Sequence, residues 1–190
     1  MENQFIITIS RNKGSGGYEI ASIISEKLGV SLYSKDIVDD MVLVGNMSYS
    51  VDDNDCITVP KRFKGKHAKL LKRSTEFCTF SYIRGRAVAG ESFVVVGRCA
   101  DYILSDLDCV TRVFITADKD WRAERIAAEK GISKAKAKGH IRRTDRRRKR
   151  FHNRYCDTRW GTEECYDYII DSTGKSFDEL ADRIISFINT

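Results

Sequence analysis

The 190-residue sequence lacks the features that mark membrane-spanning and secreted proteins. No apolar run approaches the length of about 18 residues that a membrane-spanning helix needs. The first residues, MENQFIITIS, enter an expected strand at once and leave no room for a signal peptide. With a single proline and 42% hydrophobic residues, the chain also lacks the composition of disordered or collagen-like proteins. We therefore expect one cytoplasmic domain over residues 1–190, with no membrane partner.

Disulfide and metal-binding signatures are also missing. The six cysteines include no C-x-x-C pair and match no common zinc spacing, so we expect free and mostly buried thiols. The three histidines, His67, His140 and His152, stand among polar residues without a nucleophile or metal partner, and we expect them at the surface. The sequence alone identifies neither a set of metal ligands nor the oligomeric state.

The positive charge of the chain is confined to one segment. The formal net charge is +6, but residues 142–154 hold seven arginines and one lysine against one aspartate, which leaves the rest at −1. The charge is therefore a property of this segment and not of the whole surface.

Apolar runs and apolar periodicity predict an alternation of strands and helices. We expect strands over 5–9, 30–33, 92–97, 110–117 and 166–172. We expect helices from the glycines to residue 28, and over 35–44, 67–88, 118–130, 133–155 and 176–188, with a mobile polar loop over 45–65. Such alternation indicates an α/β fold in which helices cover both faces of a parallel sheet. Ligands bind such sheets beyond the carboxyl ends of the strands, here after Ile9, Val96 and Ile115.

A glycine-rich loop follows the first expected strand. Gly14, Gly16 and Gly17 stand between that strand and a helix, where glycines let the backbone approach a phosphate and the helix N-terminus attracts an anion. The alternative is an ordinary strand-to-helix turn. Its position at the first strand of a parallel sheet favours a phosphate site.

This loop lacks a lysine. Aligned with the pattern G-x-x-x-x-G-K-[ST], the sequence RNKGSGGY places Arg11 at the first glycine, Gly17 at the lysine and Tyr18 at the hydroxyl residue. Each lost charge-assisted contact costs about 1.5–3 kcal/mol unless another group replaces it. We expect Arg11 and Lys13 to replace the lysine. Ser10, Ser15 or a water-bridged carboxylate could hold Mg²⁺ in place of the missing hydroxyl.

A second polar position follows the strand over 92–97. Gly97 and Arg98 stand at its carboxyl end, where a guanidinium suits bidentate phosphate binding. The alternative is an arginine paired with a carboxylate at the rim.

Taken in order, several stretches resemble the nucleoside monophosphate kinases, and among them the cytidylate kinases and their cytidylate-kinase-like relatives. These stretches are ITIS…GSGGYEIASIISEKLG, VVVGRCADYIL, VFITADKDWRAERI, the arginine-rich helix and YDYIIDSTGKSFDEL. The resemblance implies a three-layer P-loop NTPase fold with a five-stranded parallel sheet, and ATP-dependent, Mg²⁺-assisted phosphoryl transfer to a nucleoside monophosphate. It also implies an acceptor-binding insertion over about 35–90 and a helical lid over about 133–160.

The resemblance assigns expected roles by position. The donor nucleotide is expected at Gly14, Ser15, Gly16, Gly17, Tyr18, Arg122, Ser172 and Thr173. The acceptor is expected at Lys35, Asp36, Arg98 and Asp101, and the transferred group at Arg11, Lys13, Arg98, Arg142, Arg146 and Arg148.

The acceptor segment departs from the cytidylate kinases. They carry an aspartate after the Gly-Arg pair, where this chain has Cys99, and an Asp-Ser-Gly run where it has Ser34, Lys35 and Asp36. CMP or dCMP is the favoured acceptor. The alternatives are another small acceptor, or a nucleotide- or RNA-binding protein of the same fold with little activity.

The arginine helix has three interpretations. One helical stripe carries Arg142, Arg146, Arg150 and Arg154, so several guanidiniums can face a transferred phosphoryl group, as in a lid. The run could instead bind nucleic acid, or be a solvated charged face. The lone acid Asp145 is expected to pair with Arg148 and Lys149, and Trp160 to be a packing anchor.

Overall fold

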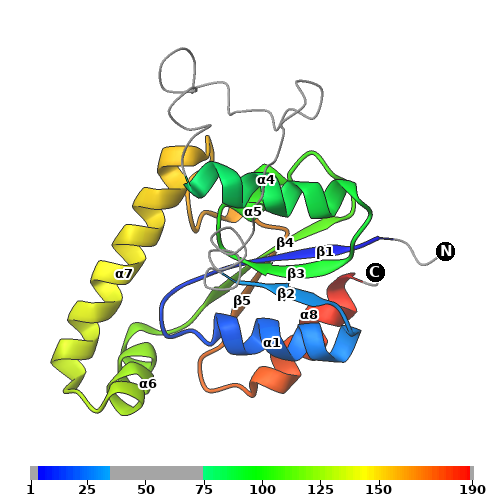
Figure 1. Ribbon diagram of the computed structural model, residues 1–190. Coiled ribbons are helices and arrows are strands. Elements are labelled where there is room, and N and C mark those ends of the chain that lie inside the picture. The colour runs from blue at the N-terminus through cyan, green and yellow to red at the C-terminus, as the bar shows by residue number, and fades with distance from the viewer. Residues whose placement is uncertain (1–3, 35–74, 189–190) are drawn as a thin grey trace.

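The computed structural model describes residues 4–34 and 75–188. Within these ranges the chain forms a five-stranded parallel sheet in the order β2-β3-β1-β4-β5. The strands are β1 (Ile6–Arg11), β2 (Ser31–Tyr33), β3 (Phe93–Val96), β4 (Val110–Thr116) and β5 (Tyr168–Asp171). β1 lies at the centre, paired with β3 on one side and β4 on the other. The loop that leaves β1 therefore starts from the middle of the row of carboxyl strand ends (Figure 1). The expected parallel α/β sheet is confirmed.

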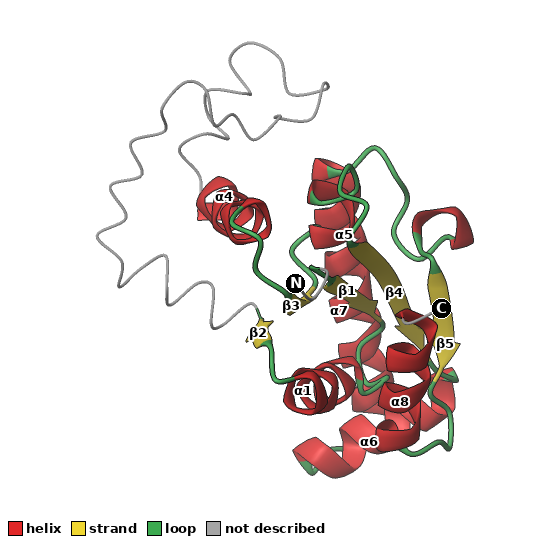
Figure 2. Cartoon of the chain, turned by 90° about the vertical axis from the view of Figure 1, so that its right-hand side faces the viewer, coloured by secondary structure: helices red, strands yellow, loops and turns green. Residues whose placement is uncertain are grey.

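Helices cover both faces of the sheet. The longer described helices are α1 (Gly17–Leu28), α4 (Thr75–Val88), α6 (Lys119–Lys130), α7 (Lys134–Tyr155) and α8 (Phe177–Ile188). α1 and α8 lie against one face, while α4 and the short α5 (Ala100–Ile103) lie against the other (Figure 2). No helix of the described residues is long and apolar enough to cross a membrane.

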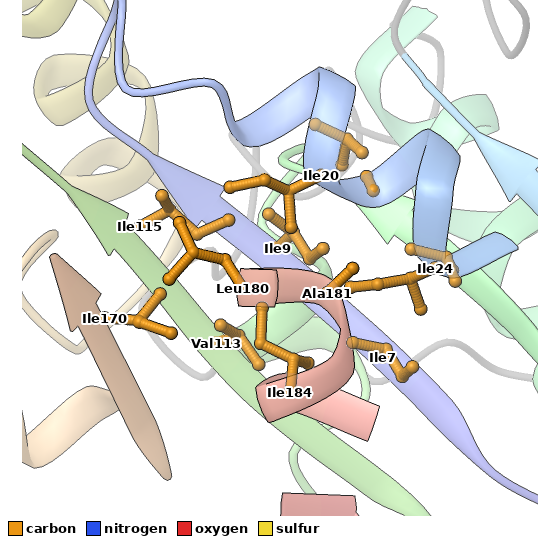
Figure 3. Close-up of a cluster of buried hydrophobic side chains, with 13 residues drawn as sticks. Ile7, Ile9, Ile20, Ile24, Val113, Ile115, Ile170, Leu180, Ala181 and Ile184 are labelled. Carbon is orange, nitrogen blue, oxygen red and sulfur yellow. The ribbon is translucent and has the colours of Figure 1, made fainter. Parts of the chain in front are cut away.

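The largest apolar cluster lies between the sheet and the pair α1 and α8. Figure 3 shows Ile9 of β1 and Ile115 of β4 meeting Ile20 of α1 and Leu180 of α8. All four side chains are fully buried, and burying an isoleucine or leucine contributes about 1.5–3 kcal/mol relative to exposure. This cluster fixes α1 on the sheet, and with it the glycine loop that precedes α1.

A second apolar cluster fixes the opposite face. Phe93 and Val95 of β3 pack with Tyr82 and Ile83 of α4 and with Ala100 of α5. Alternate residues of β3 point to opposite faces, which explains its uninterrupted apolar sequence. The turn after β3 is therefore held from both sides.

α6 and α7 form a helical hairpin beside the carboxyl ends of the strands (Figure 1). The first half of α7 packs on α6 through Ala137 and Ile141, and its end packs through Tyr155 on Phe80 and Cys99. Arg142, Arg143, Arg146, Arg147, Lys149, Arg150 and Arg154 are exposed, whereas Asp145 and Arg148 are half-buried. The helix thus has an outer basic face and an inner face toward the sheet.

The expected elements agree with the described ones to within a few residues. The predictions for 35–44, 45–65 and the first part of 67–88 lie outside the described residues. The four-residue α5 and the 3₁₀ turn η1 (Glu163–Cys165) were not predicted, because such short elements show no apolar periodicity. The cysteines in the described ranges are free, and Cys99, Cys156 and Cys165 are buried, as expected. Trp160 packs edge-on against Phe114, as expected of an anchor.

Candidate functional site

The loop between β1 and α1 is held in place by buried side-chain hydroxyls. Ser15 is fully buried, and its Oγ donates to the carbonyl oxygens of Asn12 and Ile115, each at 3.0 Å. Ser172, after β5, donates from its own Oγ to the Ser15 carbonyl oxygen at 2.7 Å. The hydroxyls of Ser15 and Ser172 therefore tie the loop to the carboxyl ends of β4 and β5 rather than facing a ligand.

Glycine is required at two positions of this loop for lack of space. At Gly16, where φ is +80°, an added Cβ would collide with the ring of Phe177. At Gly17 it would lie 2.6 Å from Cβ of Arg11. The N–H groups of Gly16, Gly17 and Tyr18 make no hydrogen bond among the described residues. They are the free donors that an anion at a helix N-terminus needs.

The packing of Arg11 over Gly17 explains the missing lysine. In the usual pattern the first position is glycine and the seventh is lysine; here the first is arginine and the seventh is glycine. The Arg11 side chain runs across Gly17 toward the end of β3, where its Nη1 lies against Gly97. A lysine stem at position 17 and the arginine at position 11 would need the same space. The cation has thus moved from one end of the loop to the other.

Four arginines, Arg11, Arg98, Arg147 and Arg148, line one cavity at the carboxyl ends of β1 and β3. Arg11, Arg98 and Arg148 border a volume of about 430 Å³, together with Ser10, Glu76, Val96, Gly97, Cys99, Thr144, Arg147, Phe151, His152 and Trp160. Arg148 donates from Nη1 to the Arg11 carbonyl oxygen at 3.0 Å. Burial and the positive charges of Arg148 and Arg98 lower the pKa of Arg11 to about 9. A bound anion would relieve this mutual repulsion.

Arg98 stands in a strained turn. Gly97, Arg98 and Cys99 have successive positive φ angles of 76°, 59° and 56°. For a residue other than glycine the left-handed region costs about 1–2 kcal/mol. The turn is closed by hydrogen bonds from Gly97 N–H to the Ile9 carbonyl oxygen at 3.0 Å and from Ala100 N–H to the Gly97 carbonyl oxygen at 3.1 Å. The strain places the half-buried Arg98 at the cavity instead of along the strand.

Behind this turn lies a buried polar pair that sequence reasoning missed. Nε2 of His152, in α7, lies 2.8 Å from Oδ2 of Asp101, in α5, and the side chains are 4% and 3% exposed. The expectation of a surface His152 is therefore wrong, and Asp101 is buried with its carboxylate toward α7. Asp101 Oδ1 and His152 Nδ1 have no hydrogen-bond partner among the described residues. Each such atom costs about 1–3 kcal/mol.

Asp145 fastens α7 to the glycine loop. Its Oδ1 accepts from the Lys13 backbone N–H at 2.7 Å, and its Oδ2 pairs with Nη1 of Arg122 at 2.7 Å. The expected pairing with Arg148 and Lys149 is thus replaced by inward contacts. Arg122 is 5% exposed and also donates to the carbonyl oxygens of Ala117 and Lys13, so its guanidinium supports the loop.

Arg125 covers the loop from the other side. Its Nη1 donates to the Gly14 carbonyl oxygen at 2.9 Å, and its guanidinium lies 4.6 Å from the Phe177 ring centroid and 5.2 Å from that of Trp121. Phe177 in turn lies on Gly16. No sequence signal pointed to Phe177, because its contact with Gly16 joins the first and last helices of the described chain.

The remaining predicted residues are scattered. Thr173 accepts a hydrogen bond from the Asp118 N–H through Oγ1, and Tyr18 is 48% exposed. Arg142 and Arg146 are exposed and do not line the cavity. Lys35 and Asp36 lie outside the described residues. The structure therefore brings Arg11, Arg98 and Arg148 together with the loop, and it leaves Arg142 and Arg146 on the outer face of α7.

The loop fits a nucleotide's phosphates better than it fits a protein-held Mg²⁺. Free N–H groups and three cations suit phosphate oxygens. For the metal, the position of the usual hydroxyl is taken by Tyr18, and the nearby Asp145 is already bound to Lys13 and Arg122. No group of three or more His, Cys, Asp or Glu side chains that could hold a metal ion occurs in the described part of the chain.

Comparison with known proteins places this site in context. A model described as the cytidylate kinase-like family matches residues 6–174. An uncharacterized protein from Eubacterium ventriosum is 32% identical with a TM-score of 0.79, covering 98% of this chain and 99% of that one. No curated protein matches the chain.

More distant solved structures share the P-loop kinase fold. Shikimate kinase from Acinetobacter baumannii, in complex with shikimate, is 14% identical with a TM-score of 0.55, covering 99% of this chain and 94% of that one. A gluconokinase from Sinorhizobium meliloti gives 14% and 0.55 as well, covering 100% and 94%. At these identities the likeness is one of fold alone.

Proposed function

Because the chain belongs to the cytidylate kinase-like family, we propose that it transfers the γ-phosphoryl group of ATP to a small anionic acceptor. The observation that carries the proposal is the convergence of Arg11, Arg98 and Arg148 on one cavity beside the glycine loop. CMP and dCMP are the first acceptors to test. The fold and the family support a phosphotransferase, whereas the choice of acceptor is our inference.

The proposed mechanism consists of positioning and charge stabilisation, with no covalent intermediate on the enzyme. The N–H groups of Gly16, Gly17 and Tyr18 hold the donor's phosphates at the N-terminus of α1. Arg11 supplies the charge that a lysine supplies in the usual loop. Arg98 and Arg148 hold the transferred group, and one well-placed arginine accelerates phosphoryl transfer by about 10³ to 10⁵. Lys13 is the second expected replacement for the lysine, and its backbone N–H is bound to Asp145.

The acceptor is constrained by the walls of the cavity. Phe151 and Trp160 offer aromatic surface, and Arg147 offers a further charge. Asp101 is paired with His152 and is not among the residues that line the cavity, so we infer that it does not replace the aspartate that the cytidylate kinases carry after Gly-Arg. We therefore infer that a phosphate or carboxylate on the acceptor, rather than its base, contributes most of its binding energy.

The test is ADP formation from ATP and Mg²⁺ with CMP, dCMP, UMP, AMP and GMP, with each product identified by chromatography. A matched control is Arg98→Gln, which removes one of the positive charges of the cavity. Conversion of one monophosphate to a diphosphate by the parent, and its loss in the control, is the expected result. If ADP stays at the enzyme-free level with every acceptor although ATP binds, nucleoside monophosphates are not the substrates.

The outer face of α7 favours a second candidate function, nucleic-acid binding. Among its exposed cations, Lys134 and Lys138 form ion pairs with carboxylates of α6. The other exposed cations have no carboxylate partner among the described residues. Oligonucleotide affinity that falls steeply with salt, in a protein that shows no turnover, would favour this candidate. A weak response to salt with active turnover would reject it.

A further inference from the structure

The buried pair of Asp101 and His152 has no role in the proposed chemistry, yet it connects the two elements that carry cavity arginines. Asp101 follows Arg98 by three residues, and His152 follows Arg148 by four residues along α7. Residues four apart lie on one face of a helix, so His152 and Arg148 face the same side. The 2.8 Å contact between His152 Nε2 and Asp101 Oδ2 therefore sets the position of the Arg98 turn relative to Arg148.

Stability does not explain this pair. One oxygen of Asp101 and one ring nitrogen of His152 have no partner among the described residues, although both groups are more than 95% buried. Replacing a buried ion pair by apolar side chains is often neutral or stabilising. What the pair provides is a fixed geometry between α5 and α7.

The strained turn needs such a constraint. Non-glycine residues with positive φ persist only where their surroundings hold them, and Arg98 and Cys99 are two in succession. Asp101 stands two residues after Cys99, within the first turn of α5. Its contact with α7 holds the end of the turn from the side on which Arg98 faces the cavity.

We propose that Asp101 and His152 are positioning residues, which fix the separation of the Arg98 and Arg148 guanidiniums so that both meet one anion. The turnover part of the test rests on the proposed function. Its binding part does not, because an anion can be bound without being transferred.

The binding test uses inorganic pyrophosphate as the probe and Trp160 as the reporter. Trp160 lines the cavity, and the chain has two tryptophans, so Trp121→Phe leaves one signal. In this background, Asp101→Asn and His152→Leu are expected to weaken pyrophosphate binding about ten-fold, and thermal unfolding shows whether each variant is folded. The two changes together should weaken it no further than either alone, because each breaks the same contact.

Two further variants separate positioning from packing. His152→Gln keeps a donor close to the place of Nε2, whereas His152→Leu fills the space without one, so the leucine variant should bind pyrophosphate more weakly than the glutamine variant. As a matched control, Asp167→Asn breaks the 2.6 Å ion pair with Arg112 between β4 and β5. This control should leave pyrophosphate affinity at the parent value.

Turnover supplies the second readout. Asp101→Asn is expected to lower kcat about a hundred-fold, with KM for ATP within about two-fold of the parent, because misplaced arginines affect the transition state most. Pyrophosphate binding in Asp101→Asn and His152→Leu equal to that of the parent overturns the proposal, as does a parent that does not bind pyrophosphate. A parent that binds pyrophosphate, with the expected losses in the variants, but transfers to no acceptor supports the positioning role and rejects the proposed function.

Discussion

Two strand-to-helix turns lie at the carboxyl ends of β1 and β3, and they reach positive φ by different means. After β1 the positive angles fall on Gly14 and Gly16, where they cost little. After β3 they fall on Gly97 and then on Arg98 and Cys99, where they are strained. The first turn offers backbone N–H groups and needs no side chain at its bends. The second must present a guanidinium, so a side chain has to occupy the strained position.

The comparison teaches where each turn is vulnerable. In the glycine loop the limit is space, since Phe177 and Arg11 lie where a Cβ would be. In the Arg98 turn the limit is the strain of the left-handed backbone. Contacts with β1 and α7 keep the turn in this strained conformation. Substitutions should therefore have opposite effects on stability at the two places.

The largest effect is expected from Arg98→Gly. Glycine relieves the left-handed strain, so the free energy of unfolding should rise by about 1 kcal/mol, while loss of the guanidinium lowers turnover by about 10³ or more. Urea denaturation and steady-state kinetics measure the two. A destabilised Arg98→Gly protein would contradict our account of the turn.

The next largest effect is expected from exchanging the glycine and the cation between positions 11 and 17 of the first loop. Gly17→Lys alone should destabilise the protein by about 1–3 kcal/mol, because its stem overlaps Arg11. The double variant Arg11→Gly with Gly17→Lys should recover most of that loss and bind ATP. A double-mutant cycle on ATP affinity and unfolding free energy gives the coupling. Additive losses would show that the two positions are not exchanged.

A smaller effect is expected from Asp145→Asn, which weakens the tie between α7 and the loop. Loss of the charge-assisted bonds to Lys13 N–H and Arg122 should lower the free energy of unfolding by about 1.5–3 kcal/mol. Glu124→Gln, which breaks an exposed pair with Lys134, is the control and should change it by less than about 0.5 kcal/mol. Equal effects of the two variants would mean that the tie is no stronger than a surface ion pair.

The smallest effect is expected from removing the metal. Because arginines supply the cavity charge and the described residues hold no metal ligand set, affinity for ATP should change by less than about ten-fold when Mg²⁺ is chelated. Isothermal titration with and without EDTA measures this. A loss of ATP affinity greater than about ten-fold in EDTA would contradict this prediction.

Much of the fold could be predicted because strands and helices leave local patterns. The glycine loop and Arg98 could be placed because both directly follow an apolar strand. Asp145, by contrast, binds a residue 132 positions away, and His152 pairs across 51 positions. Such contacts leave no periodicity, and a polar residue in a basic helix resembles its solvated neighbours until the fold brings a partner to it.

The packing of Arg11 over Gly17 also matters for how such proteins are found. A text search for G-x-x-x-x-G-K-[ST] passes over this chain, because its cation and its glycine stand in the reverse order. The two orders fill the same space with the same kinds of group. A pattern that accepts R-x-x-x-x-G-G directly after an apolar strand would find sequences that the usual pattern misses. In each of them the arginine is expected to pack over the second glycine, as Arg11 does over Gly17.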